Sequence, residues 1–318
     1  MQQVDDLTLI KLLGKGSFGE VYLSKLKAKN QYFATKKMER AIVDKPNFYK
    51  YFENEINLLK HLNHPNIVKL EGIKASKQHY YIIMEYINGG GLSDCLKKYM
   101  EKHKKAFPEE IVQYLMKQII EGLYYIHKQK IIHRDLKLDN IMINFDSDID
   151  KQNLNMMKAK IKIIDFGFAI KLSEEKNKLA FTAVGSPINM DPLILNKFAK
   201  RKGIELGYDE KVDIWSIGTV CYELLIGKAV FDATSLEDLI EKVETGKFTV
   251  PKTVSKEIVS FLNGMLQYDS KMRLSAEELR KHTFLNKNVS QFTKMDTVRA
   301  TKKPESKVKK NKNYLGYF

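Results

Sequence analysis

Residues 131–143 have the sequence "IIHRDLKLDNIMI", and this stretch decides how the whole chain is interpreted. Its apolar ends, Ile131–Ile132 and Ile141–Ile143, are typical of short buried strands. Between them lie six polar or ionisable side chains: His133, Arg134, Asp135, Lys137, Asp139 and Asn140. Polar groups are costly to bury without partners, so this dense set between two buried strands indicates a chemical role.

Length and composition limit the class of protein that the chain can form. A chain of 318 residues is expected to form about two domains or lobes, and a hydrophobic content of 43% is enough for a sizeable core. The two cysteines, Cys95 and Cys221, argue against a disulfide framework and favour a reducing compartment. The N-terminus lacks the pattern of a signal peptide, and no apolar run has the length of a membrane span. We therefore expect a soluble, cytoplasmic protein.

The net charge of +15 has two interpretations. One is an ordinary basic surface, and the other is a surface that binds nucleic acid or acidic lipid. Part of the excess lies in "VRATKKPESKVKKNKNY" near the C-terminus, which is rich in Lys and has one Glu. This composition predicts a solvated tail over 286–318 that has room for an acidic partner, with no obligate nucleic acid.

The pattern of hydrophobic residues divides the rest of the chain. Alternating stretches around residues 7–26, 32–38, 66–73 and 79–87 predict strands, and the helical spacing of Phe52, Ile56 and Leu59 predicts one helix among them. The sequence "NGGGL" at 88–92 predicts a hinge, and helical patterns follow to about Leu285. We therefore expect an α+β protein with a small antiparallel sheet lobe over 7–87 and a larger, mainly helical lobe over 88–285.

One polar stretch interrupts the predicted strands "NIMIN" and "KIKIIDF". It has the sequence "FDSDIDKQNLNMMKA", residues 145–159, and shows no clear period. Surface loops lengthen at little thermodynamic cost, so we interpret it as a tolerated insertion in a hairpin.

A glycine cluster, "GKGSFGEV", lies near the N-terminus. The G-x-G-x-x-G spacing also occurs in dinucleotide-binding turns, but those open a helix, whereas the residues that follow alternate as in a strand. A hairpin that covers nucleotide phosphates fits better, and an ordinary hairpin turn is the alternative. On the next strand, in "FATK", Ala34 and Lys36 share one face, and Glu55 beside the apolar stripe of the predicted helix needs a cation such as Lys36.

Taken together, these motifs resemble a known family. "GKGSFGEV", "FATK", Glu55, "HRDLKLDN", "DFG" and "DIWSIG" occur in the order and spacing of eukaryotic protein kinases, over about residues 7–285. The resemblance implies the bilobal protein-kinase fold and a serine/threonine protein kinase that uses ATP and Mg²⁺. Its substrates would be proteins with Ser or Thr hydroxyls.

The resemblance also implies roles for individual residues. Asp135 would accept the substrate proton, Lys137 would neutralise the moving phosphoryl group, and Lys36 with Glu55 would complete the catalytic set. Asn140 and Asp165 would bind Mg²⁺. The nucleotide would be held by Leu13, Gly14, Gly16, Ser17, Gly19, Val21, Ala34, Lys36, Met84, Glu85, Ile87 and Met142, with the backbone of Glu85 and Ile87 at the adenine edge.

Further positions follow from the same resemblance. An apolar column that ties the lobes together would contain Leu59, Leu70, His133 and Phe166, and Asp213 would brace the catalytic loop. Arg134 would bind a phosphate on the activation loop, and Thr182 and Ser173 are the candidate phosphorylation sites. Either an activating kinase or autophosphorylation would place that phosphate.

Two departures from the family pattern affect the interpretation. The family's Ala-Pro-Glu is Asp191-Pro192-Leu193 here, and the missing glutamate normally pairs with an arginine that matches Arg273. Arg273 therefore needs another partner or stays solvated. Gly91 stands where many kinases that prefer basic substrates carry an acid, although Asp139 could do part of that work.

Alternatives remain at this point. "DFGFA", "NGGGLSDCL" and "GSP" are similar to both autophagy-initiating (ULK-like) kinases and the calcium/calmodulin-dependent group. A pseudokinase scaffold is disfavoured because Lys36, Asp135 and Asp165 are all present. Binding of the basic tail to membranes or nucleic acid could coexist with catalysis.

Overall fold

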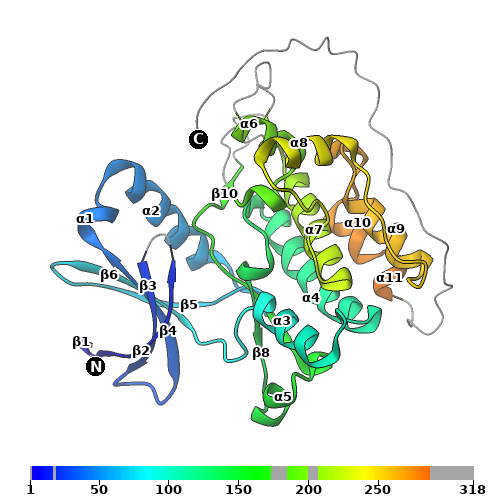
Figure 1. The fold of residues 1–318 in the computed structure, drawn as a ribbon. Helices are drawn as coiled ribbons and strands as arrows, with labels where there is room; N and C mark the ends of the chain where they lie inside the picture. The colour runs from blue at the N-terminus through cyan, green and yellow to red at the C-terminus, as the bar shows by residue number, and fades with distance from the viewer. Residues whose placement is uncertain (1, 17–18, 173–184, 200–206, 287–318) are drawn as a thin grey trace.

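The computed structural model describes residues 2–16, 19–172, 185–199 and 207–286. Within these ranges the chain forms two lobes, with a β-sheet in one and mostly helices in the other (Figure 1). This is the α+β, bilobal arrangement that the sequence predicts. The predicted sites at Ser17, Ser173 and Thr182, and nearly all of the predicted tail, lie outside the described residues.

The smaller lobe is built on an antiparallel sheet of six strands in the order β1-β2-β3-β4-β6-β5. The strands are β1 (Gln2–Val4), β2 (Leu7–Gly16), β3 (Gly19–Leu26), β4 (Tyr32–Glu39), β5 (Leu70–Ala75) and β6 (His79–Glu85). The sheet therefore begins before residue 7, because β1 folds back on β2 through a turn in which Asp5 has a φ of 54°. A strand of three residues is too short to produce a recognisable period in the sequence.

Two helices pack beside this sheet, a short α1 (Arg40–Val43) and the longer α2 (Pro46–His61). Phe52 and Ile56 of α2 are buried in one apolar cluster with Met38 of β4 and Ile82 of β6. The helical spacing that predicted α2 thus also determines which face it turns to the sheet. Glu55 precedes Ile56 and is 3% exposed, so its carboxylate is carried into the edge of this core.

The larger lobe has its core around α4 (Glu109–Lys128) and α7 (Lys211–Ile226) (Figure 1). Nearly every residue of α7 is buried, as its uniformly apolar sequence predicts. The other described α-helices are α3 (Leu92–His103), α5 (Asp148–Asn153), α6 (Pro192–Phe198), α8 (Leu236–Thr245), α9 (Lys256–Met265), α10 (Ala276–Arg280) and α11 (Thr283–Asn286). Short 3-10 helices occur at Leu138–Asn140, Met156–Lys158, Pro187–Asn189 and Ser270–Met272.

Short strands lie between the helical lobe and the sheet. They are β7 (Ile131–Ile132), which pairs with β10 (Ile170–Lys171), and β8 (Ile141–Asn144), which pairs with β9 (Lys160–Ile163). The predicted strand ends of the opening motif are therefore β7 and β8. The chain between the lobes is anchored here, because the amide of Gly89 donates to the carbonyl oxygen of Ile143 at 2.8 Å.

The predicted insertion does connect the hairpin strands β8 and β9, but it is not an irregular loop. It contains α5, whose first turn is capped by the Ser147 hydroxyl, followed by the 3-10 helix Met156–Lys158. Phe145, Met156 and Ala159 are buried in the core of the lobe. Single buried residues spaced through a polar segment explain why no period was visible.

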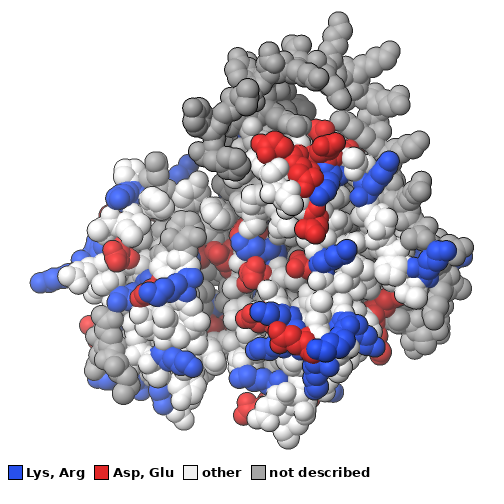
Figure 2. All heavy atoms as spheres, in the orientation of Figure 1, with Lys and Arg blue, Asp and Glu red and all other residues white. Residues whose placement is uncertain are grey.

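Charged side chains cover much of the molecule. Figure 2 shows Lys and Arg over both lobes of the visible face, with acidic side chains grouped over the region where Figure 1 places α8. We find no helix among the described residues with the length and hydrophobicity needed to cross a membrane.

Candidate active site

The catalytic loop between β7 and β8 is held in place by hydrogen bonds to α7. The carboxylate of Asp213, fully buried, accepts hydrogen bonds from the backbone amides of His133 at 2.8 Å and Arg134 at 2.9 Å. Burial alone would raise the pKa of Asp213, but the hydrogen bond and charge of His127 hold this pKa below its ordinary value. The ionised carboxylate stabilises Arg134 at a φ of 70°, a conformation that costs a non-glycine residue energy.

Four side chains meet at the catalytic loop, that of Asp135 and three that surround it. Lys137 Nζ lies 3.0 Å from Asp135 Oδ2, and Asn140 Nδ2 donates to the same oxygen at 2.9 Å. The hydroxyl of Ser186 donates to Asp135 Oδ1 at 2.9 Å and accepts a 2.6 Å hydrogen bond from Lys137. The sequence predicted the first three as neighbours, and Ser186 joins them from a distant part of the chain.

Lys36 and Glu55 form the ion pair that the sequence predicts. Lys36 Nζ lies 3.0 Å from Glu55 Oε2 and 3.2 Å from Oε1, and the two side chains are 13% and 4% exposed. Burial would lower the pKa of Lys36, but the charges of Glu55 and Asp165 outweigh it and raise this pKa. Lys36 is therefore a permanent cation between two carboxylates.

Asp165 is presented by the end of the β8–β9 hairpin. Its φ is 62°, and its Oδ1 accepts from the amide of Gly167 at 3.3 Å. The next residue, Phe166, is fully buried against the His133 ring, with ring centres 4.9 Å apart. His133 Nε2 lies 3.0 Å from the carbonyl oxygen of Ile164, which only accepts, so this nitrogen carries the proton.

The column expected from the resemblance is partly visible in this packing. Leu59 is 2% exposed, and His133 and Phe166 are fully buried. Leu70 is partly buried and packs against the cores of both lobes.

A cavity of about 360 Å³ lies between the lobes. This volume falls within the range of ~300–1,000 Å³ that is usual for small-molecule sites. Apolar side chains line one part, and Lys36, Glu55, Asp135, Lys137 and Asp165 line another. The predicted nucleotide residues that line it are Leu13, Gly14, Gly16, Gly19, Val21, Ala34, Lys36, Met84, Glu85, Ile87 and Met142.

The β2–β3 hairpin forms one wall of this cavity. A Cβ atom on Gly19, whose φ is 151°, would lie 2.2 Å from the carbonyl oxygen of Lys37, so the fold requires glycine there. A Cβ on Gly14 would meet no atom within 4 Å. Packing within the described residues therefore leaves space beside Gly14, and its proposed role at a nucleotide stays a prediction.

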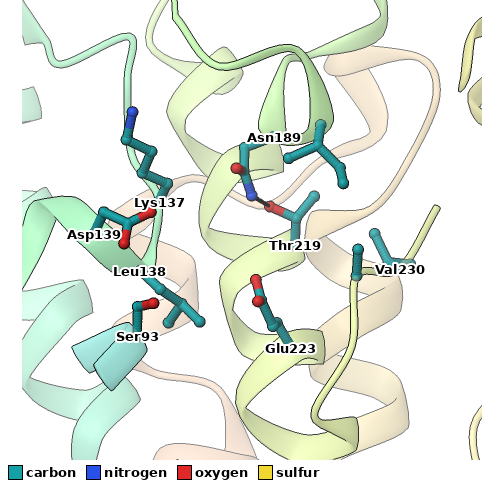
Figure 3. A pocket seen from close by; sticks show the side chains of 10 residues that line it. Ser93, Lys137, Leu138, Asp139, Asn189, Thr219, Glu223 and Val230 are labelled. Carbon is teal, nitrogen blue, oxygen red and sulfur yellow. Dashed lines mark hydrogen bonds between the residues drawn. The ribbon is translucent and has the colours of Figure 1, made fainter. Parts of the chain in front are cut away.

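A second, smaller cavity of about 130 Å³ lies beside Lys137 (Figure 3). Asp139 of the catalytic loop and Glu223 of α7 both contribute to its lining. Burial, and then the charge of Asp139, raises the pKa of Glu223. Neither carboxylate forms a salt bridge with another described residue, and Lys137 is the cation that lines the cavity with them.

Arg134 is 7% exposed and already has partners. Its Nε donates to the carbonyl oxygen of Phe168 at 2.6 Å, and its Nη1 lies 3.1 Å from the Tyr208 hydroxyl. The predicted contact with a phosphate on Thr182 involves a residue outside the described ranges and stays a prediction.

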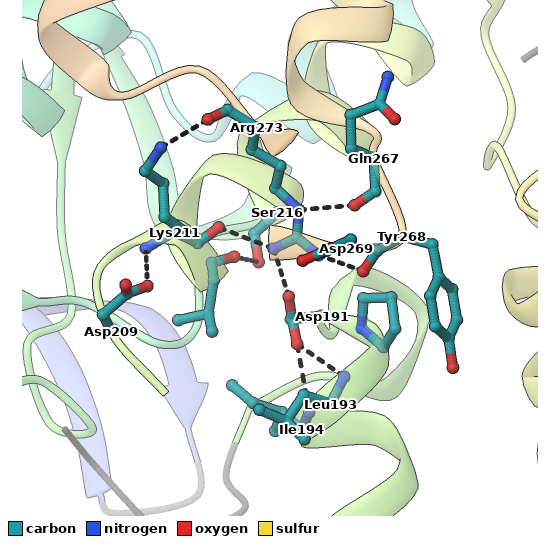
Figure 4. Close-up of polar contacts among 12 residues, drawn as sticks. Asp191, Leu193, Ile194, Asp209, Lys211, Ser216, Gln267, Tyr268, Asp269 and Arg273 are labelled. Carbon is teal, nitrogen blue, oxygen red and sulfur yellow. Dashed lines mark hydrogen bonds and ion pairs between the residues drawn. The ribbon is translucent and has the colours of Figure 1, made fainter. Parts of the chain in front are cut away.

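Arg273 is buried and paired, so of the two alternatives given by the sequence, another partner or a solvated side chain, the first holds (Figure 4). Its Nη1 pairs with Asp191 Oδ2 and also donates to the carbonyl oxygen of Lys211 at 2.9 Å. Asp191, two residues before Leu193, therefore supplies the carboxylate that Leu193 lacks.

Some residues of the site were missed from the sequence. Ser186, Glu223, Val68, Tyr86, Ile164 and Phe168 contact the predicted site or line its two cavities. Only Ser186 had a sequence signal, its place before Pro187 in "GSP". Of the others, Glu223 lies on α7, and Val68, Tyr86, Ile164 and Phe168 lie in loop segments next to strands, where their types are those of ordinary core or surface residues.

Comparison with known proteins agrees with this geometry. A family model described as protein kinase domain matches residues 7–285. Calcium-dependent protein kinase 4 of Plasmodium berghei (strain Anka) is 34% identical over 280 residues, which cover 87% of this chain and 48% of that protein. Serine/threonine-protein kinase atg1 of Dictyostelium discoideum is 34% identical over 295 residues, covering 91% and 40%. Serine/threonine-protein kinase 33 of Bos taurus is 32% identical over 285 residues, covering 88% and 55%. The chain thus spans about half the length of these relatives.

Proposed function

The chain belongs to the protein kinase family, of the eukaryotic serine/threonine type, and on that premise we propose that it transfers the γ-phosphoryl group of Mg-ATP to serine or threonine hydroxyls of protein substrates. The observation that carries the proposal is the cluster of Asp135, Lys137, Asn140 and Ser186 at the wall of a cavity that also contains Lys36 and Asp165. Phosphoryl transfer requires positioned groups and neutralised charge more than covalent chemistry, and this cluster supplies both.

Each polar residue has a chemical task in this proposal. The carboxylate of Asp135 orients the substrate hydroxyl and accepts its proton. Lys137, which contacts both Asp135 and Ser186, neutralises negative charge on the phosphoryl group as it moves. Lys36, a permanent cation beside Glu55, holds the phosphates that stay behind, and the β2–β3 hairpin covers them with backbone amides.

The residues present fit Mg²⁺. The carboxylate of Asp165 and the side-chain oxygen of Asn140 are the hard ligands that this ion prefers. The described residues contain no group of three or more His, Cys, Asp or Glu side chains that would hold a metal alone. That suits an ion bound by one or two protein ligands together with substrate phosphates, whose negative charge it would neutralise.

The smaller acidic cavity supports a finer proposal about the substrate. Asp139 and Glu223 line this cavity beside Lys137, and neither forms a salt bridge with another described residue. A Lys or Arg side chain near the phosphorylated residue would supply the missing charge. A preference for basic substrates can thus arise from Asp139 and Glu223, even though this chain has Gly91 where many such kinases carry an acid.

Regulation through the activation loop is also a proposal. A phosphate on Thr182 would add about two negative charges, for which Arg134 is the partner that the family resemblance implies. Autophosphorylation and an activating kinase are both compatible with the sequence.

Transfer of ³²P from Mg-ATP to a generic basic protein tests the proposed function. The wild type is compared with Asp135→Asn and with Asp148→Asn, a matched change on the exposed surface of α5. We expect Asp135→Asn to lower transfer about 100-fold or more while ATP still binds, because it removes the proton acceptor. Asp148→Asn should behave as the wild type, and the phosphorylated amino acid should be Ser or Thr. ATP binding without transfer by the wild type would instead point to a missing activator or to the pseudokinase alternative.

A further inference from the structure

The segment Ser186–Asp191 connects the proposed catalytic centre to the core of the helical lobe. At its first residue, the Ser186 hydroxyl contacts Asp135 and Lys137. At its last residue, Asp191 pairs with Arg273, and the two side chains are each 1% exposed. A buried arginine and a buried carboxylate that meet in this way hold the chain far more firmly than a surface pair would.

Arg273 is a fixed anchor for this segment (Figure 4). Its Nε donates to the carbonyl oxygen of Gln267 at 2.7 Å and its Nη2 to that of Tyr268 at 3.2 Å. Its guanidinium carbon lies 5.1 Å from the centre of the fully buried Trp215 ring. Backbone carbonyl oxygens thus accept hydrogen bonds from the guanidinium, and Asp191 is the carboxylate with which it pairs.

Asp191 also begins the next helix. Its Oδ1 accepts from the amides of Leu193 at 2.7 Å and Ile194 at 3.4 Å, so it is the N-cap of α6, while Oδ2 faces Arg273. One carboxylate therefore fixes both the end of the segment and the start of the helix. Leu193, at the position of the family's glutamate, takes no part in the pair.

The middle of the segment lies against α7. The Ser216 hydroxyl donates to the carbonyl oxygen of Asn189 at 2.8 Å, and the Asn189 amide donates to the Thr219 hydroxyl at 2.8 Å (Figure 3). Ile188 and Asn189 also line the acidic cavity. A displaced segment would therefore alter both the Ser186 contacts and the wall of the proposed substrate site.

We propose that Asp191 is a positioning residue, which through its buried pair with Arg273 holds Ser186–Asp191 in register with Asp135 and with the acidic cavity. It takes the place of the family's glutamate from a position two residues earlier. The inference rests on the proposed kinase function for its kinetic consequence. No residue of the segment lines the larger cavity, although Ser186 contacts Asp135 and Lys137, which do. We therefore expect the loss in kcat and in KM for the protein substrate, with little change in KM for ATP.

Three variants of the full chain test this role. Asp191→Asn removes the charge but keeps an N-cap acceptor, since Asn caps helices as well as Asp. Asp191→Asn/Leu193→Glu moves the carboxylate to the family's position. Asp191→Asn/Arg273→Met removes both charges, which avoids leaving a buried charge unpaired if the first variant does not fold. Leu279→Ala, which truncates a buried side chain of α10, controls for a general loss of stability.

Two readouts are needed, and the first is kinetic. With a synthetic peptide that has one serine flanked by arginines, we expect Asp191→Asn and the double-neutral variant to lower kcat/KM by about tenfold or more. KM for ATP should change less than twofold. The Asp191→Asn/Leu193→Glu variant should recover most of the kcat/KM that Asp191→Asn loses. Leu279→Ala should lower the melting temperature and leave kcat/KM at a lower assay temperature unchanged.

The second readout is hydrogen exchange of the amides in 185–195, which needs no activity. We expect faster exchange than in the wild type for Asp191→Asn and Asp191→Asn/Arg273→Met, which lack the pair. Exchange should slow again in Asp191→Asn/Leu193→Glu and should not change in Leu279→Ala. The inference would be overturned if Asp191→Asn/Arg273→Met folds and shows wild-type peptide kinetics and wild-type exchange. It would also be overturned if Asp191→Asn/Leu193→Glu folds and restores neither the peptide kinetics nor the slow exchange. If the wild type transfers no phosphate, the proposed function fails, and the exchange data still decide whether Asp191 positions the segment.

Discussion

The Ser186 hydroxyl donates a 2.9 Å hydrogen bond to Oδ1 of Asp135, although the two residues are 51 positions apart. Lys137 Nζ contacts both, at 2.6 Å from the Ser186 oxygen and 3.0 Å from Asp135 Oδ2. The three side chains therefore form a closed triangle in which each fixes the orientation of the other two. The proposed proton acceptor is oriented by a residue from outside its own loop.

Removal of the Ser186 hydroxyl should slow the chemical step. We expect Ser186→Ala to lower kcat about 10- to 100-fold, because Asp135 and Lys137 lose the partner that holds them in place. Ser186→Thr keeps the hydroxyl and should retain most activity. Ser260→Ala, on the exposed surface of α9, is the matched control. Steady-state kinetics with a peptide substrate measure the effect, and an unchanged kcat for Ser186→Ala would contradict it.

The Lys36–Glu55 pair should matter for ATP. Glu55→Gln removes a charge-assisted hydrogen bond that contributes ~1.5–3 kcal/mol, so kcat/KM for ATP should fall about 10- to 100-fold. Glu53→Gln, two residues away on the exposed side of α2, should have little effect. The ATP dependence of the initial rate distinguishes them. Equal loss in both variants would mean that the helix, and not the pair, is responsible.

The acidic cavity should select the substrate. Asp139→Asn and Glu223→Gln should each reduce, by about tenfold, the preference for a peptide with arginine near its serine over the same peptide with alanine there. Rates with the alanine peptide should change little. Glu237→Gln, exposed on α8, serves as the control. Preference retained in the Asp139→Asn/Glu223→Gln double variant would show that arginine is recognised elsewhere.

The same cavity predicts a dependence on pH. Because burial and Asp139 raise the pKa of Glu223, this carboxyl keeps its proton at pH values above 4.5, where an ordinary glutamate is ionised. The advantage of the arginine peptide should therefore increase as the pH rises through the raised pKa and then level off. Glu223→Gln should remove this increase. A pH profile of the ratio of kcat/KM values for the two peptides provides the measurement.

Phosphorylation of Thr182 should raise activity. After incubation with Mg-ATP, or with an activating kinase, we expect Thr182→Ala to be several-fold less active than the wild type, and Ser173→Ala to be less affected. Mass spectrometry of the incubated protein locates the phosphate. Wild-type activity in a Thr182→Ala protein would exclude this site as the switch.

Much of the proposed site could be predicted from the sequence because its parts are local. Asp135, Lys137 and Asn140 lie within six positions on one loop, so their proximity follows from chain connectivity. Lys36 and Glu55 are on different elements, but alternation along the strand and the apolar stripe of the helix turn both toward the same core edge. The structure brings these two residues within 3.0 Å.

The sequence by itself determined the fold class, the order of the elements and the residues of the catalytic loop, since these depend on local periodicity and short-range motifs. Only the tertiary structure decided which carboxylate pairs with Arg273, that Ser186 contacts Asp135, and that Asp139 and Glu223 share a cavity. The partners in these contacts come from separate elements, and a carboxylate or hydroxyl in sequence carries no mark of the distant group it will meet. The partner of Arg273 lies two residues before the family's position because the Asp191 carboxylate at the N-cap of α6 reaches the buried guanidinium, and no local sequence pattern records that packing.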